Sequence, residues 1–429
     1  MVHLKRALKV CATLAALALS LRFVSLGFMR YDDYNRHKTF MKSKTDYDVI
    51  FLGTSHVRET ANPMQLWNKY GITSYNLGSS SASIPMSYWM LRFAKDYHKP
   101  KLAMIDVYGL RASFKDDRGS IGPMHTAFDT FPLFQTKWQA MHDLCVKNRS
   151  RAEFVFPFCS YHNRWKEIGL KAIIENMVKG LRGYYKTSVT KGLTYSYIGI
   201  DRGKGGFETN TRYKGTESTG MEYCRRFIAW CKENGIIPIF MLVPYAGART
   251  TTDSSENTDT WLSALRLILE EEGVLFLDML DGVVDFDIDK YEDSHLNPSG
   301  ARKVTDAIGA FLSETLGCQS HKDDPAFAAW HGDYDAYRQW LLGIIARQGD
   351  FKNLLMMTNH AEVYAAVRAG NYAAFDAVEE KLLFENWSDI RFERTGAEDA
   401  AVSVTVFERG TDREVVTRRF EKEQIAGEE

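Results

Sequence analysis

Short runs of consecutive apolar residues alternate with longer amphipathic segments between residues 48 and 316. A continuous apolar run is typical of a strand that is covered on both faces, as in a parallel sheet. The predicted strands are Val49–Leu52, Thr73–Leu77, Leu102–Val107, Ile237–Val243 and Val274–Leu280. The segments between them repeat apolar residues every three or four positions, which predicts helices. These helices are Pro63–Tyr70, Pro85–Tyr97, Met221–Glu233, Trp261–Glu272 and Pro298–Leu316.

This alternation predicts a three-layer α/β/α sandwich with a parallel five-stranded sheet, because parallel strands need helical crossovers. We expect this domain to cover residues 46–318. The segment from about residue 111 to 218 is rich in aromatic and basic residues and lacks strand alternation, so we interpret it as a helical insertion. Insertions after strand ends often build the binding crevice of such folds.

A polar segment near residues 319–324 predicts a boundary, followed by a small α+β domain over 325–429. Tyr334–Arg347 has helical spacing, and Val402–Phe407 alternates like a half-buried strand. Gly410–Asp412 predicts a turn, after which Glu414–Phe420 returns as the hairpin partner. No catalytic cluster occurs in this part of the sequence, and its role stays open.

The N-terminal segment, residues 1–30, predicts a signal peptide or a signal anchor. The uncharged apolar run Val10–Leu21 is shorter than the roughly 20 residues that a membrane-spanning helix needs. If Arg22 reaches out of the apolar layer, the run extends to Met29 and is long enough. We expect a single anchor in the cell membrane with the catalytic domain outside, or secretion after cleavage. A packed helix of a cytosolic protein is the alternative.

The overall composition narrows the function without identifying it. Lys and Arg number 54 and Asp and Glu 55, so the net charge of −1 argues against a general nucleic-acid binder. The six cysteines form no C-x-x-C pair, and no Cys/His spacing suggests zinc. Neither G-x-G-x-x-G nor a P-loop occurs, so we expect no cofactor and no metal.

Two polar segments carry candidate catalytic groups. Ser55 follows the first predicted strand in Gly53-Thr54-Ser55-His56, and Asp293-Ser294-His295 precedes the last predicted helix. A serine nucleophile needs a base, and that base needs an acid to fix its tautomer. In extended backbone, Asp293 and His295 point the same way and supply both. Each segment alone is more typical of a helix cap or an ordinary loop; their positions at strand ends favour a site.

A third segment, Tyr75-Asn76-Leu77-Gly78-Ser79, ends the second predicted strand. A glycine there lets a substrate approach the backbone, so the N–H groups of Gly78 and Ser55 are candidates to bind an oxyanion. Taken alone, the segment is more typical of a plain strand-ending turn.

Together the three segments resemble the SGNH (GDSL-like) hydrolase superfamily, whose domain has a flavodoxin-like fold. The resemblance covers about residues 46–316 apart from the insertion. It implies that Ser55 is the nucleophile, Gly78 the oxyanion glycine, and Asp293 with His295 the acid–base pair. The third strand ends in Asp106-Val107-Tyr108-Gly109 without the family's Asn. The Tyr108 hydroxyl is therefore the candidate replacement donor.

The last segment also departs from the common pattern. One residue separates Asp293 from His295, where secreted esterases have two, and Glu292 competes as the orienting acid. This spacing and the missing Asn resemble the alginate O-acetyltransferase branch, and more distantly the membrane-anchored D-alanine transfer protein of teichoic-acid synthesis. The likeness implies acyl transfer or ester hydrolysis on a cell-surface polysaccharide or acylated sugar, beside a membrane-bound partner that supplies the acyl group.

Other interpretations remain open at this stage. Arg164 and Trp165 of the insertion suit sugar binding, although such a set is more often explained by loop packing. His56 beside His295 suggests a metal, but no third ligand has suitable spacing. The missing Asn favours a catalytically weak envelope scaffold or glycan-binding protein as the alternative function, whereas the intact Ser, His and Asp oppose it.

Overall fold

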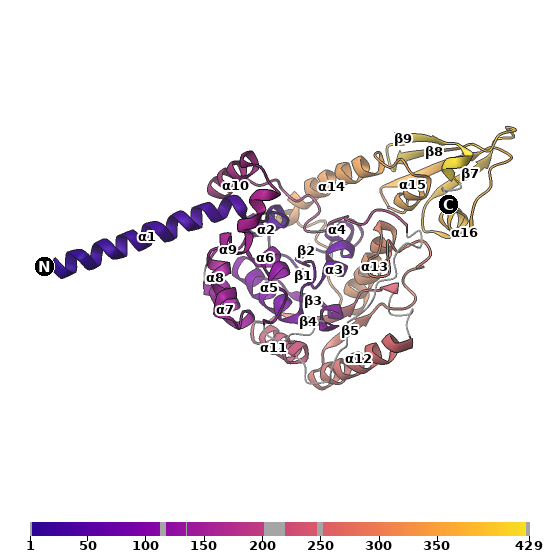
Figure 1. Ribbon diagram of the computed structural model, residues 1–429. Helices are drawn as coiled ribbons and strands as arrows, with labels where there is room; N and C mark the ends of the chain where they lie inside the picture. The colour runs from indigo at the N-terminus through magenta and orange to yellow at the C-terminus, as the bar shows by residue number, and fades with distance from the viewer. Residues whose placement is uncertain (1, 112–116, 134, 201–218, 247–251, 426–429) are drawn as a thin grey trace.

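A five-stranded parallel sheet forms the centre of the molecule. A computed structural model describes residues 2–111, 117–133, 135–200, 219–246 and 252–425 (Figure 1). The sheet order is β2-β1-β3-β4-β5, which is the flavodoxin-like order. The strands are β1 (Val49–Leu52), β2 (Ser74–Asn76), β3 (Leu102–Asp106), β4 (Ile237–Leu242) and β5 (Leu275–Asp278). All four pairings are parallel, so the carboxyl ends of the strands share one edge.

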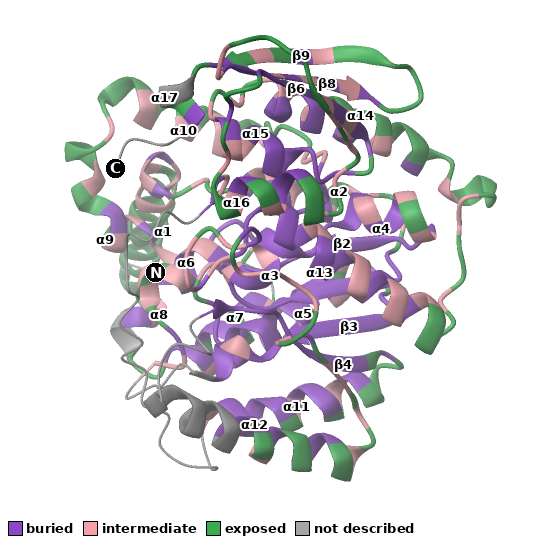
Figure 2. Cartoon of the chain, turned by 90° about the vertical axis from the view of Figure 1, so that its right-hand side faces the viewer, coloured by how far each residue is buried: buried purple, intermediate pink, exposed green. Residues whose placement is uncertain are grey.

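Helices cover both faces of this sheet and make three layers. Ile50, Ile105 and Phe240 point to the face covered by α5 (Ile84–Tyr97), α11 (Thr219–Glu233) and α12 (Thr252–Glu272). Their neighbours Phe51, Met104 and Ile239 pack on the other face against α13 (Pro298–Ala310), α3 (Ser55–Thr60) and α4 (Pro63–Tyr70). Figure 2 shows β2, β3 and β4 as almost wholly buried. The predicted α/β/α fold class is therefore confirmed.

The expected insertion is helical where the structure describes it. Its residues 112–116, 134 and 201–218 lie outside the described part. Its first turn is η1 (Val107–Arg111), after which the chain forms α6 to α10 and a further 3₁₀ turn. These elements are α6 (Ile121–Phe128), α7 (Gln135–Leu144), α8 (Asn148–Val155), α9 (Phe158–Tyr161), η2 (His162–Lys166) and α10 (Leu170–Arg182).

The C-terminal part contains a second sheet, of order β7-β6-β8-β9, in which β6 and β7 are parallel and the other pairs antiparallel. Its hairpin strands β8 (Val402–Glu408) and β9 (Arg413–Phe420) match the predicted hairpin. The sequence did not predict β6 (Val363–Ala369) or β7 (Ile390–Arg394). The remaining elements are η4 (Phe311–Thr315), η5 (Pro325–Phe327), α14 (Ala329–Ile345), α15 (Phe351–Met357), α16 (Ala377–Glu380), η6 (Lys381–Glu385) and α17 (Lys422–Ile425).

Two buried contacts join the C-terminal part to the sheet domain. Asn359 donates to Ser299 Oγ in the first turn of α13, and Asn62, the N-cap of α4, donates to Tyr337 of α14. Buried hydrogen bonds of this kind fix the orientation of the two parts, because a buried polar group that loses its partner and gains no water destabilises the fold. The C-terminal part is thus joined to α13 and α4 of the sheet domain.

The N-terminal helix α1 (Val2–Phe28) projects from the body (Figure 1). His3–Phe28 is long and apolar enough to cross a membrane, judged by length and composition. α2 (Tyr34–Lys42) follows it and packs into the sheet domain through Phe40, which is fully buried.

Candidate active site

The turn between β1 and α3 holds Ser55 at the carboxyl edge of the sheet. Gly53 has a φ of 140°, and a Cβ there would lie 2.8 Å from Cβ of Asp106, so no larger residue fits. Thr54 caps α3 by accepting from His56 N–H. Ser55 is the first residue of α3, and its N–H has no acceptor within the described part of the chain. This N–H is therefore free to bind a developing oxyanion.

Ser55 and His295 meet although 240 positions separate them in the sequence. The Oγ atom of Ser55 lies 2.8 Å from Nε2 of His295. The other ring nitrogen, Nδ1, lies 2.6 Å from Oε1 of Glu292. A carboxylate at Nδ1 holds the ring proton there, so the lone pair of Nε2 points at the serine hydroxyl. This is the geometry in which a histidine can take a proton from serine.

The acid that orients His295 is Glu292, and the expected role of Asp293 needs correction. Asp293 instead bonds Lys290, with Oδ1 3.1 Å from Nζ. The expectation assumed extended backbone, but the chain reverses here. His295 N–H donates to the Glu292 carbonyl, and Glu292 N–H donates back to His295. The reversal brings the side chains of residues 292 and 295 together and leaves Asp293 at its tip.

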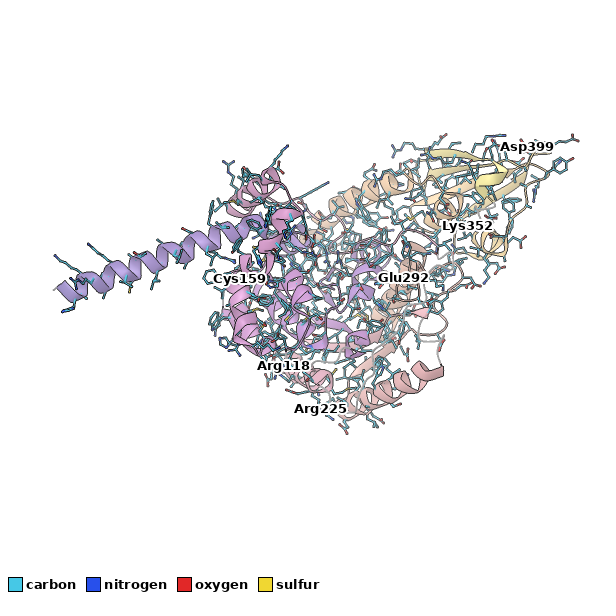
Figure 3. All side chains as sticks on the ribbon, viewed as in Figure 1. Arg118, Cys159, Arg225, Glu292, Lys352 and Asp399 are labelled. Atoms are coloured by element: carbon cyan, nitrogen blue, oxygen red, sulfur yellow. The ribbon has the colours of Figure 1, made fainter. Side chains whose placement is uncertain are left out.

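The same loop is held firmly at its base. Asn297 caps α13 by accepting from the N–H groups of Ser299 and Gly300, and its amide donates to the Ile288 carbonyl. Asp289 is fully buried and accepts from Ser299 Oγ and Lys303 Nζ at 2.6 Å each. These bonds fix the direction from which His295 reaches Ser55. Glu292 lies at the rim of the sheet domain close to α13 (Figure 3).

The N–H of Gly78, expected to bind the oxyanion, is already engaged, because it donates to Asn76 Oδ1 at 2.9 Å. The Asn76 amide donates to the carbonyls of Val57 and Ala61 and so ties β2 to α3. Arg36 donates to the Gly78 carbonyl from the far side. Gly78 thus supports the Ser55 turn, and a Cβ there would lie 2.8 Å from Arg58 N. The assignment of Gly78 as a donor needs correction for this structure.

Aromatic rings surround the Ser55–His295 pair. The candidate donor Tyr108 stacks on His56, with ring centroids 3.7 Å apart, and His56 lies 5.4 Å from the His295 ring. Tyr197, which the sequence did not indicate, covers His295 at 4.2 Å. Rings packed this closely exclude water from the imidazole and strengthen its hydrogen bonds.

The position of Tyr197 depends on Glu59, a buried carboxylate on α3. Glu59 accepts from Ser196 N–H at 2.8 Å and from the hydroxyls of Ser196 and Thr194 at 3.0 Å. The segment before Tyr197 is thus fixed to the helix that begins with Ser55. The aromatic content of the insertion was the available signal for this contact, but it could not identify the residue.

A buried carboxyl lies directly behind the Ser55 turn. Asp106 ends β3, is completely buried, and accepts from Val243 N–H and from Thr54 Oγ1. Desolvation raises its pKa to about 7, against the opposing effect of these hydrogen bonds. Asp106 thus supports the Ser55 turn from behind, through its contact with Thr54.

Arg164 and Trp165, expected to bind sugar, lie elsewhere. The Arg164 guanidinium donates to the carbonyls of Phe28 and Met29 at the end of α1. The last carbonyls of a helix have no partner within the helix, so an arginine there is satisfied structurally. Trp165 is exposed beside it. The structure therefore places both residues at the base of α1 and not beside Ser55.

A second hydrogen-bonded Ser, His and Asp set occurs in the insertion. Ser160 Oγ lies 3.0 Å from Nε2 of His125, whose Nδ1 lies 2.9 Å from Asp129. Ser160 also donates to Glu153 at 2.8 Å. The Ser160 hydroxyl has a single proton and donates it to Glu153, so this proton is directed at a carboxylate and not at His125. Ser160 therefore differs from Ser55, whose hydroxyl lies against His295, and serves as a control below.

Metal ligands do not cluster in the described ranges: no group of three His, Cys, Asp or Glu side chains there could hold an ion. His56 and His295 approach each other as rings packed edge to face.

Comparisons with known proteins give structural likenesses but no match to a family model or to a curated protein. Among solved structures, the chain is similar to a Bacteroides fragilis protein with a provisional description as an acylhydrolase. The identity is 10%, the match covers 66% of this chain and 95% of the other, and the TM-score is 0.33. A likeness this distant carries no argument about function, which rests on the residues described above.

Proposed function

We propose that this protein is a serine-dependent enzyme that hydrolyses or transfers an acyl ester. The observation that carries the proposal is the chain of contacts from Ser55 Oγ to His295 Nε2 and from His295 Nδ1 to Glu292, at 2.8 and 2.6 Å. The pair lies at the carboxyl edge of a parallel sheet, where open α/β folds bind ligands. His295 is mostly buried, whereas Glu292 is partly open to solvent.

In the first step Ser55 Oγ attacks the acyl carbonyl carbon while its proton passes to His295 Nε2. Glu292 stabilises the imidazolium that forms. The Ser55 N–H holds the oxyanion. Collapse of this intermediate breaks the ester bond, and the proton on Nε2 goes to the leaving alcohol. The acyl-serine then reacts with water or with an acceptor hydroxyl, whose proton returns to Ser55 through His295.

Two further observations bear on the identity of the acyl donor and acceptor. The resemblance to polysaccharide O-acetyltransferases and the helix α1 together support an acceptor on a cell-surface polysaccharide, an acetyl donor, and a membrane-bound partner that supplies the acyl group. Orientation with the catalytic domain outside the membrane is part of this proposal. The enzyme is a hydrolase if water reaches the acyl-serine, and a transferase if an acceptor hydroxyl does.

The engaged N–H of Gly78 favours one alternative, a weakly catalytic scaffold that binds glycan. Loss of one oxyanion donor typically costs about 100- to 1,000-fold in rate. With Ser55 N–H as the one donor identified, turnover by this site would be slow unless substrate binding frees a second. The intact Ser55–His295–Glu292 contacts argue for the enzyme.

The test is turnover of a chromogenic acetate ester by the full chain in detergent, with and without an oligosaccharide acceptor. The enzyme proposal predicts turnover that His295→Ala reduces by about 1,000-fold or more. Ser160→Ala, which removes the serine of the second set, should leave turnover unchanged. Formation of acetylated oligosaccharide would identify a transferase. Release of the chromogenic alcohol at the same rate with and without the acceptor would identify a hydrolase. Equal turnover by wild type and His295→Ala would contradict the enzyme proposal.

A further inference from the structure

The helix α10 carries an uncovered apolar stripe beside the base of α1. Leu170, Ile174, Val178 and Leu181 recur at intervals of four, four and three residues, so they lie along one line of the helix. Their side chains are between 40% and 73% exposed. Four adjoining apolar side chains left open to water are uncommon on a soluble surface and mark an interaction site.

A neighbouring line of the same helix packs on α1. A Cβ on Gly27 would lie 2.7 Å from Ile173 Cγ2, and one on Gly180 would lie 3.1 Å from Leu26 Cδ2, so the two backbones run close together. Asn176 donates to the Gly27 carbonyl at 3.2 Å. The apolar side of α10 is therefore wider than α1 can cover. α10 and the end of α1 lie against each other at the edge of the body (Figure 1).

The length of α1 indicates what covers the remainder. As a helix, the uncharged run Val10–Leu21 is only about 18 Å long, whereas the hydrocarbon core of a bilayer is about 30 Å thick. About 20 residues counted from Val10 reach Met29, beyond the point where α10 packs on α1. Arg22 within that stretch donates to the Val155 carbonyl and so has a partner inside the body. A bilayer crossed by α1 would therefore extend to α10.

The polar residues of α10 suit the same surface. Lys171 and Arg182 border the apolar stripe, three residues before Ile174 and four after Val178, as do cations of helices that lie in the headgroup layer. Trp165 and Tyr184, at either end of the helix, are each 61% exposed, and aromatic rings of this kind gather at membrane interfaces.

We propose that α10 is an interfacial membrane helix, which inserts its Leu170–Leu181 stripe into the bilayer beside α1 and holds the body against the membrane surface. The candidate active site would then face substrates at a fixed height above the lipid. This inference does not depend on the catalytic proposal, because it concerns a different surface.

The test uses the full chain in vesicles of phosphatidylcholine and phosphatidylglycerol, with the photo-crosslinking residue benzoylphenylalanine at one site. Ile174, within the stripe, is compared with its neighbour Glu175, on the charged side. Both sites are exposed, so folding should be unaffected, which circular dichroism would verify. The proposal predicts at least about five times more lipid adduct at residue 174 than at 175.

Three results would overturn it. Equal lipid adducts at both positions would show that the stripe has no preference for lipid. Absence of a lipid adduct at residue 174, with α1 inserted in the same vesicles, would place α10 outside the membrane. Cross-linking of residue 174 to a second copy of the chain would assign the stripe to a dimer.

Discussion

Glu292 and His295 form a hydrogen bond of 2.6 Å across a backbone reversal, and the other nitrogen of the same ring lies 2.8 Å from Ser55 Oγ. A single short loop thus supplies both the base and the group that orients it. Asp293 lies between them in sequence and is paired with Lys290. The two carboxylates are therefore expected to differ sharply in their effect on catalysis.

Glu292→Gln should lower kcat by about 100- to 10,000-fold, because the amide stabilises neither the imidazolium nor the correct ring tautomer. Asp293→Asn, the matched control, should lower it by less than about fivefold, since it removes a partly exposed ion pair. Steady-state hydrolysis of an acetate ester measures both. A larger loss for Asp293→Asn than for Glu292→Gln would return the orienting role to Asp293.

Tyr197→Ala should uncover the His295 ring and lower kcat/KM by about tenfold, because water then competes for the imidazole. Tyr197→Phe keeps the ring and should retain most of the activity. Circular dichroism and the midpoint of urea unfolding separate this effect from simple loss of folding, because both should stay close to those of the wild type in the two variants. Equal losses in both variants would assign the effect to the hydroxyl.

Asp106 should make the protein less stable as the pH rises from about 4 to about 7. Its pKa is raised to about 7 by desolvation, so between these values the folded chain holds a proton that the unfolded chain has released. The shift corresponds to at most about 4 kcal/mol, lost progressively as pH approaches the raised pKa. Asp106→Asn should flatten this dependence in urea unfolding at pH 5 and 8. An unchanged slope would contradict the assignment.

Gly53→Ala should cost more than about 2 kcal/mol in unfolding free energy, because the residue combines a positive φ with a Cβ position 2.8 Å from Asp106. Gly273→Ala is the matched control, since Gly273 also has a positive φ but open space around it. Its cost should be nearer 1 kcal/mol. Equal costs would indicate that the approach to Asp106 is easily relaxed.

The sequence predicted the sheet well because buried parallel strands leave a plain signal. Val49–Leu52 is apolar at every position, and its structure is fully buried. By contrast, Val363–Ala369 contains three alanines and follows a polar loop, so its alternation of apolar and polar residues is weak. It nevertheless forms a strand with one parallel and one antiparallel neighbour. Strand pairing supplied by distant residues decided its conformation.

Within the candidate site, the sequence predicted which segments meet but not which atoms. Ser55 and His295 were expected to lie close together because both segments fall at the carboxyl edge of the predicted sheet. Asp293 was expected to orient His295 from an extended-backbone rule that fails in a turn, where hydrogen bonds between residues 292 and 295 set the directions. The N–H of Gly78 was expected to face the substrate, but it donates to Asn76 Oδ1, a contact that the sequence does not indicate.

The most direct test of the central claim is covalent labelling of the full chain with a fluorophosphonate probe, followed by mapping of the labelled peptide by mass spectrometry. The account predicts one adduct, on Ser55, which disappears in Ser55→Ala and in His295→Ala and persists in Ser160→Ala. Labelling that survives Ser55→Ala, or that maps to Ser160, would contradict it.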